Sequence, residues 1–266
     1  MTANLSTGAI QFRNDGGVQW LVFDQPAKHN ALSMRMVKDA LEAVRNFNED
    51  EQQRVLILTG GGNRAFVSGA DISEFENEAD KDIGERQYSK LSTELFEAVA
   101  DCPKPTMAMI HGYCFGGGVA LAAACDLRYA SDDALFSIPA AKLGIAYSLT
   151  FAKWVMDLVG PAAAREMLYS GRRYDSGEAE RLQLVNRVHV KHLLEEEVSK
   201  LADTIANNAP LSVRSTKQTV RYLLSDPAER DRDACESLIS ACAESRDFAE
   251  GRAAFAEKRT PAFVGR

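Results

Sequence analysis

The sequence predicts an α/β protein with parallel strands in its first half and a helical C-terminal region. Apolar, strand-like runs alternate with helical patterns up to about residue 136, which is typical of a parallel sheet crossed by helices. After about Thr150 strand-like runs nearly vanish, and apolar residues recur at helical spacing. A Gly-rich turn that follows a buried strand and opens a helix is the third observation, and it marks a candidate site.

Each element follows from hydrophobic periodicity and from capping or breaking residues. Residues 18–23 and 54–59 are apolar enough for buried strands, and Ser33 is suited to cap a helix over 33–47. A helix over 82–99 should end before Pro103, and strand, helix and strand then recur from 107 to 136. Helices are expected in the C-terminal region at 150–159, 162–169, 191–207, 211–224 and 228–243.

Composition excludes several classes of protein. The chain has 266 residues, 45% of them hydrophobic, and a net charge of -7, so it is long enough for one large domain. An acidic chain with scattered cations is not expected to bind nucleic acid, although a few local cations suffice for a phosphate ligand. Neither a signal-peptide pattern nor a membrane-spanning apolar run is visible. The five cysteines lack metal-ligand spacing, which favours a reduced, cytoplasmic protein without a metal site.

The most informative motif is the Gly-rich stretch His111-Gly-Tyr-Cys-Phe-Gly-Gly-Gly-Val-Ala120, which follows the apolar run 106–110. Backbone N–H groups at a helix N-terminus are unpaired and carry partial positive charge, so they suit a developing anion. Adjacent glycines let a substrate approach that backbone without interference from a Cβ atom. A second loop of this kind lies upstream at residues 64–72.

Together the two loops resemble the crotonase superfamily, the enoyl-CoA hydratase/isomerase-like enzymes. The resemblance covers nearly the whole chain and also includes Asn30-Ala31-Leu32, Leu58-Thr59-Gly60, Leu143-Gly144 and Glu257-Lys258-Arg259. It implies a crotonase-like spiral of ββα units over residues 1–200, which binds acyl-CoA, and a helical trimerisation or covering region over 201–266. It also implies a homotrimer or a dimer of trimers, and coenzyme A carried as part of an acyl-CoA thioester substrate without another cofactor.

The resemblance assigns two backbone N–H groups, those of Ala70 and Gly117, to an oxyanion hole for the thioester enolate. Hydratases of the family carry one glutamate three residues after the oxyanion-hole glycine and another just after a downstream proline. This chain has Ala120 and Ala140 at those positions. Water addition needs a base and an acid, and a methyl group is neither. The standard hydratase reaction is therefore not expected.

Tyr147 and Ser148 are candidates for replacement groups because family members place reacting residues in this segment. Dienoyl-CoA isomerases carry an aspartate where Ser148 stands, and methylmalonyl-CoA decarboxylases carry a tyrosine where Tyr147 stands. Those decarboxylases also have a histidine where this chain has Ala70. With an ordinary pKa near 10, the Tyr147 phenol would orient or donate rather than act as a base. The alternative is that Tyr147 only walls the pocket.

Other polar residues near the loops have ordinary structural readings. Glu74, Glu85 and Tyr88 lie where the family sometimes forms one wall of the site, although charged residues on a helix are usually solvated. Asp71 and Asp126 each stand beside a tight turn, where a carboxylate accepts backbone N–H groups. Packing or filling roles are expected for two residues, His111 and Cys114.

For coenzyme A, the resemblance suggests Lys28 near the pantetheine or the phosphates. Backbone groups around Ala65, Phe66 and Ser68 would hold the adenine. Phe255 and Lys258 match positions that reach the nucleotide of a neighbouring subunit in the family.

Three functions stay open at this point. The first is an acyl-CoA enzyme that works through an enolate as an isomerase or decarboxylase. The second is a non-catalytic acyl-CoA-binding homologue, and the third is a weak enoyl-CoA hydratase.

Overall fold

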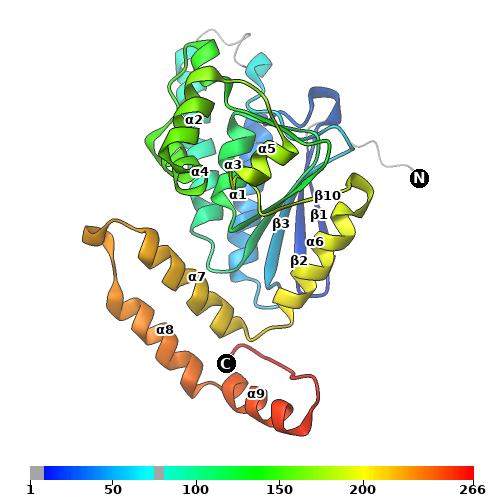
Figure 1. The fold of residues 1–266 in the computed structure, drawn as a ribbon, viewed down its shortest axis with the longest axis vertical. Coiled ribbons are helices and arrows are strands. Elements are labelled where there is room, and N and C mark those ends of the chain that lie inside the picture. Colours follow the sequence, from blue (N-terminus) through cyan, green and yellow to red (C-terminus); the bar gives the residue numbers. More distant parts are fainter. Residues whose placement is uncertain (1–8, 75–80) are drawn as a thin grey trace.

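The chain forms two β-sheets surrounded by helices in a computed structural model that describes residues 9–74 and 81–266 (Figure 1). The larger sheet has the order β1-β2-β3-β5-β7-β10. Only the β1–β2 pair is antiparallel, and every other neighbouring pair in this sheet is parallel. This confirms the predicted α/β class. The strands are β1 (Ala9–Asp15), β2 (Val18–Asp24), β3 (Val55–Gly60), β5 (Thr106–Ile110), β7 (Leu127–Ser131) and β10 (Arg187–His189).

A smaller sheet has the order β4-β6-β8-β9. From β3 to β8, successive strands alternate between the two sheets, and each such pair is followed by a helix: β3 and β4 by α2, β5 and β6 by α3, β7 and β8 by α4. The chain is thus a spiral of ββα units, as the resemblance implies. These elements are β4 (Ala65–Val67), β6 (Tyr113–Phe115), β8 (Leu135–Ser137), β9 (Tyr174–Asp175), α2 (Lys81–Ala100), α3 (Gly117–Ala124) and α4 (Leu149–Ser170).

One face of the larger sheet is covered by α1 (Met34–Glu49) together with α2 and α3. The predicted cap is confirmed, because the Ser33 hydroxyl accepts the Met36 N–H at 3.1 Å. Apolar residues of α1 such as Val37 and Phe47 are fully buried in the main core. This core fixes the positions of the strand ends from which the Gly-rich loops emerge.

The opposite face of the larger sheet is covered by α6 (Lys191–Ala206), whose Leu194 and Val198 pack with Trp20 and Ile57 in a second core. Helix α6 runs through residue 200 without a break. In Figure 1 the helices α7 (Pro210–Leu224), α8 (Arg232–Glu244) and α9 (Arg246–Glu257) extend away from the sheets. Their large exposed apolar side chains are Val220, Leu223, Leu224, Ile239, Phe248 and Phe255.

Several boundaries differ from the sequence predictions for identifiable reasons. The sequence patterns do not predict strand β1, because it is an edge strand in a hairpin with β2 and is half exposed. The predicted segments 150–159 and 162–169 form one helix, α4, which is kinked where Gly160 has a φ of 76° just before Pro161. The predictions also omit α9 and the short helix α5 (Ser176–Arg181). Within the described chain, every helix is too short or too polar to span a membrane.

Close packing between α3 and β4 makes Gly118 sensitive to substitution. A Cβ atom on Gly118 would lie 2.1 Å from the Val67 carbonyl oxygen, so Gly118→Ala requires a backbone shift. We expect the free energy of unfolding to fall by about 1–3 kcal/mol in urea denaturation. Gly117→Ala is the matched control, because its Cβ would have no contact closer than 3.8 Å. Equal stability of the two variants would contradict this packing.

Candidate active site

The two predicted loops lie side by side because β4 and β6 are parallel neighbours in the smaller sheet. The carboxyl end of β4 leads to Gly69-Ala70, and that of β6 leads to Gly116-Gly117. A Cβ atom on Gly117 would lie 4.0 Å from the Cα atom of Gly69, and one on Gly69 would lie 3.6 Å from the Phe115 carbonyl oxygen. The fold therefore brings together two segments almost fifty residues apart.

The turn into α3 depends on Gly116, whose φ of 52° and ψ of -111° are unfavourable for residues with a Cβ. The Gly116 N–H donates to the Ser137 carbonyl oxygen at 2.8 Å, which ties the turn to β8. Gly117 is the first residue of α3, so its N–H has no acceptor within the helix. An N–H in this position can bind an anion, aided by the helix dipole.

The second loop is fixed by a bridge between Ala70 and Leu32. The Leu32 N–H donates to the Gly69 carbonyl oxygen at 2.8 Å, and the Asp71 N–H donates to the Leu32 carbonyl oxygen at 2.9 Å. In a planar trans peptide the carbonyl and the following N–H point in opposite directions. The Ala70 N–H therefore points away from Leu32.

An aromatic wall stands beside Gly117. The Phe96 ring lies 3.8 Å from the position of a Gly117 Cβ, and its centroid is 5.2 Å from that of Phe151. Phe151 in turn contacts Tyr147 and Trp154, with centroid distances of 5.9 Å and 5.6 Å. Such a wall gives this side of Gly117 an apolar, aromatic surface.

The two positions where hydratases of the family carry glutamates are apolar here. Ala120 is fully buried in the core, and Ala140 is half-buried and packs against the same core. The Ala140 carbonyl oxygen accepts the Ile145 N–H at 3.0 Å, which holds the chain leading to Tyr147. Neither side chain can exchange a proton.

Tyr147 contacts the glycine turn directly, because its hydroxyl donates to the Gly116 carbonyl oxygen at 3.2 Å. Burial raises the pKa of the Tyr147 hydroxyl well above its usual value near 10, so the group is protonated and can only donate or orient at neutral pH. Ser148 instead caps α4, where its hydroxyl accepts the Phe151 N–H at 3.2 Å. Tyr147 therefore lies at the glycine turn, whereas Ser148 caps a helix.

The candidate wall residues Glu74 and Tyr88 have defined environments. The Glu74 carboxylate accepts the Met34 N–H at 2.7 Å, at the N-terminus of α1. Tyr88 is buried, and its burial together with the charges of Glu74 and Asp71 raises the pKa of its hydroxyl. Glu85 is exposed on α2. Glu74 thus has a structural partner at the start of α1.

The two aspartates have the structural partners expected of them. Asp126 accepts the Thr106 N–H at 2.8 Å and pairs with Lys217 at 2.7 Å. Asp71 pairs with Lys28 at 2.7 Å. Burial by itself would raise the pKa of Asp71, but hydrogen bonds from Lys28, Ser73 and Gln25 outweigh it and lower that pKa below its usual value.

The residues suggested for coenzyme A fall into two groups. Lys28 lies beside the loop of residues 64–72 and is half-exposed, and its carbonyl oxygen accepts the Ser68 hydroxyl at 3.2 Å. Ala65 and Phe66 lie in β4, next to that loop, with buried side chains. Phe255 is 88% exposed on α9, and Lys258 ends that helix. Figure 1 places α9 far from α2 and α4, so within one chain these last two residues are not brought to the loops.

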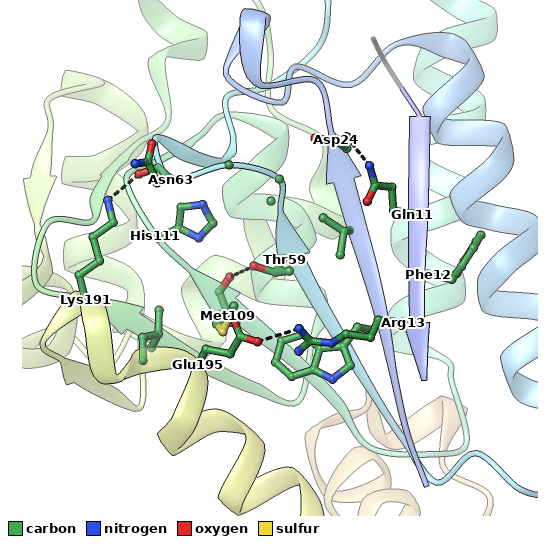
Figure 2. Close-up of a pocket in the computed structure, with 16 residues that line it drawn as sticks. Gln11, Phe12, Arg13, Asp24, Thr59, Asn63, Met109, His111, Lys191 and Glu195 are labelled. Carbon is green, nitrogen blue, oxygen red and sulfur yellow. Dashed lines mark hydrogen bonds and ion pairs between the residues drawn. The ribbon is translucent and has the colours of Figure 1, made fainter. Parts of the chain in front are cut away.

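A hollow of about 430 Å³ lies on the other side of the larger sheet, at the carboxyl ends of β2, β3 and β5 (Figure 2). None of the predicted site residues lines it. Its two basic side chains are neutralised, since Arg13 pairs with Glu195 at 2.7 Å and Lys191 pairs with Asp133 at 2.6 Å. His111, predicted to be packed, is buried in its wall. This hollow is separate from the convergent loops.

Burial of His111 has a consequence for stability at acidic pH. Burial, and then the nearby charge of Lys191, lower the pKa of His111 below its usual value of about 6.5. The unfolded chain therefore binds a proton more readily, and the free energy of unfolding should fall as pH drops below about 6.5. We expect His111→Gln to make urea unfolding midpoints less dependent on pH between about 5 and 7. An unchanged pH dependence would show that other groups account for the loss.

The comparisons with known proteins agree with this architecture. The family model described as Enoyl-CoA hydratase/isomerase matches residues 13–266. The chain is 36% identical over 264 residues to the carnitinyl-CoA dehydratase of Citrobacter koseri, with 97% of this chain and 99% of that protein covered.

Solved structures show the same similarity. An enoyl-CoA hydratase/carnithine racemase from Magnetospirillum magneticum has a TM-score of 0.91 at 33% identity, covering 98% of this chain and 97% of that one. An enoyl-CoA hydratase structure from Bacillus anthracis has a TM-score of 0.88 at 30% identity, covering 97% and 99%. The chain belongs to the enoyl-CoA hydratase/isomerase family, within the crotonase superfamily.

Proposed function

We propose that this protein binds an acyl-CoA thioester and stabilises its enolate between the N–H groups of Ala70 and Gly117. The convergence of the two Gly-rich loops carries the proposal, because it places an unpaired helix N-terminal N–H beside a second loop with a fixed peptide plane. Hydrogen bonds that strengthen as charge develops on the thioester oxygen lower the barrier to enolate formation. Coenzyme A enters as part of the substrate, without another cofactor.

The reaction that fits best avoids glutamate-pair hydration. In a decarboxylation, the bond between the α-carbon and the carboxylate breaks, and its electron pair moves onto the thioester oxygen as CO₂ leaves. This step needs no base. The α-carbon then takes a proton from a donor, a role open to Tyr147 or water. An isomerisation would use the same enolate but needs a group that removes a proton. The apolar positions Ala120 and Ala140 favour either route over hydration.

We also propose the remaining contacts with the ligand. Lys28 and the chain around Ala65, Phe66 and Ser68 lie at the loop of residues 64–72, where the nucleotide portion would be held. Phe255 and Lys258 would contact a neighbouring subunit's ligand in a homotrimer or a dimer of trimers in the cytoplasm. Residues 201–266 would then supply the trimerisation region.

Two alternatives keep specific support. The printed names of the relatives, carnitinyl-CoA dehydratase and enoyl-CoA hydratase, favour weak hydration or dehydration with water activated by other groups. The loss of both glutamates equally favours an acyl-CoA-binding protein without turnover.

A mass-spectrometric screen in deuterated water separates these functions. The purified protein is incubated with crotonyl-, dienoyl-, methylmalonyl- and aryl-CoA thioesters. Loss of CO₂ supports the decarboxylase, and deuterium uptake without another change supports the isomerase. Gain of water by an enoyl thioester would instead establish hydration, the reverse of dehydration. Binding of every thioester without any mass change would favour the non-catalytic protein.

The role of Tyr147 can be tested with Tyr147→Phe, which removes the hydroxyl and keeps the ring packing. If the hydroxyl supplies or orients the proton, turnover should fall about 10²-fold with little change in thioester affinity. Tyr169→Phe, at an exposed position on α4, is the control. Full turnover by Tyr147→Phe would mean that the ring only walls the pocket.

A further inference from the structure

We infer that Lys28 and Asp71 form a positioning device that aims the Ala70 N–H, so that Lys28 acts on the reacting end of the ligand. This inference rests on the proposed oxyanion hole. It differs from the expected role of Lys28, which is to contact coenzyme A.

The Asp71 carboxylate is held on both oxygens. Its side chain is only 6% exposed, and one oxygen accepts from Lys28 Nζ at 2.7 Å and from Gln25 Nε2 at 3.2 Å. The other oxygen accepts from the Ser73 hydroxyl at 2.6 Å and the Ser73 N–H at 3.3 Å. A nearly buried charge with four donors cannot rotate without losing hydrogen bonds that water does not replace. Asp71 is therefore a rigid anchor one residue after Ala70.

Lys28 is engaged at the same point. Its ammonium contacts Asp71 and the Ser73 hydroxyl at 2.7 Å each, and its side chain is 48% exposed. Lys28 precedes the turn through His29 and Asn30, both of which have a positive φ, and that turn delivers Leu32 to the loop. The ion pair therefore links the two segments whose backbones meet at Leu32 and Ala70.

Backbone geometry connects this ion pair to the direction of the Ala70 N–H. The Leu32 backbone accepts from the N–H of Asp71 and donates to the carbonyl of Gly69. It therefore holds the chain by hydrogen bonds on both sides of Ala70. Because the Gly69–Ala70 peptide is planar and trans, fixing the Gly69 carbonyl also fixes the Ala70 N–H on the opposite side. Any displacement of residues 28–32 relative to residues 69–73 would change the direction of that N–H. Lys28 and Asp71 resist such a displacement.

The test uses the infrared carbonyl stretch of an isotope-labelled crotonyl thioester bound to the full-length protein. Oxyanion-hole hydrogen bonds shift this stretch to lower frequency, whereas contacts with the nucleotide do not. We expect Lys28→Met and Asp71→Asn to lose part of the shift seen with the unmodified protein. Turnover of the thioester found active should fall about tenfold or more through misalignment. Lys200→Met, which removes another ion-paired lysine on α6, is the matched control.

Crotonyl-pantetheine, which lacks the nucleotide, separates the two roles of Lys28. We expect Lys28→Met to bind this shorter thioester as well as the unmodified protein does, still with a reduced carbonyl shift. A full carbonyl shift in a folded Lys28→Met variant would overturn the inference. So would weaker binding of crotonyl-CoA with an unchanged carbonyl shift, because Lys28 would then act on the nucleotide alone. Absence of any shift in the unmodified protein would instead overturn the oxyanion hole itself.

Discussion

Gly117→Pro is expected to lower thioester turnover about 10²–10³-fold, the usual effect of removing one oxyanion-hole donor. Proline deletes the N–H that would bind the enolate oxygen. The fold should tolerate it, since Gly117 is the first residue of α3, where proline is common and no helical hydrogen bond is lost. Its φ lies outside the left-handed region, and a Cβ atom would be 3.8 Å from the Phe96 ring. Steady-state kinetics with the thioester found active measure the effect.

Gly117→Ala is the matched control for this substitution. It adds the same Cβ atom but keeps the N–H, so a loss confined to the proline variant is a loss of the donor. Circular dichroism should show the same fold for both variants. Undiminished turnover by a folded Gly117→Pro protein would remove Gly117 from the proposed oxyanion hole.

Asn30→Asp is expected to lower the free energy of unfolding by about 3 kcal/mol or more. Asn30 is fully buried with a φ of 55°. Its amide donates to the carbonyl oxygens of Gly61 at 2.9 Å and Ala65 at 2.7 Å, and its side-chain oxygen accepts the Gln25 N–H at 2.9 Å. An aspartate would place an oxygen against both carbonyl oxygens, or bury a proton there at the cost of one hydrogen bond. Urea denaturation at neutral pH measures the change.

Asn46→Asp, at an exposed position on α1, controls for the added charge and should stay within about 0.5 kcal/mol of the unmodified protein. The Asn30 side chain connects the segment before α1, through hydrogen bonds, to the end of β3 and the start of β4. We therefore expect Asn30→Asp to weaken thioester binding before it unfolds the chain. A stability equal to that of Asn46→Asp would contradict the hydrogen-bond assignment.

Local patterns were sufficient where the physical cause is itself local. The Ser33 cap and the largely apolar run of β5 depend on residues within one or two turns of chain, and each appears in the structure near its predicted place. Strand β1 and helix α9 were missed because they owe their form to partners. The first pairs with β2, and the second is held at its end by Asp247, whose carboxylate accepts the N–H groups of Val264 and Gly265.

Motif recognition identified the family and both loops, but not the device that aligns them. The partners of Asp71 include Gln25 and Lys28, more than forty residues away. The hydroxyl of Tyr147 reaches Gly116, and the hydroxyl of Ser148 turns back to cap its own helix. Adjacent residues of similar chemistry thus received different environments, which spacing along the chain cannot reveal.

The sequence by itself determined the α/β class, the family, the two glycine loops and the absence of both hydratase glutamates, because each is written in local composition or motif order. Only the tertiary structure decided that Gly69 and Gly117 lie against each other, that the partly buried Tyr147 contacts the glycine turn and that Asp71 pairs with Lys28. These features arise where parallel strands end together. Their geometry depends on strand order and burial, and both are set by packing over the whole chain.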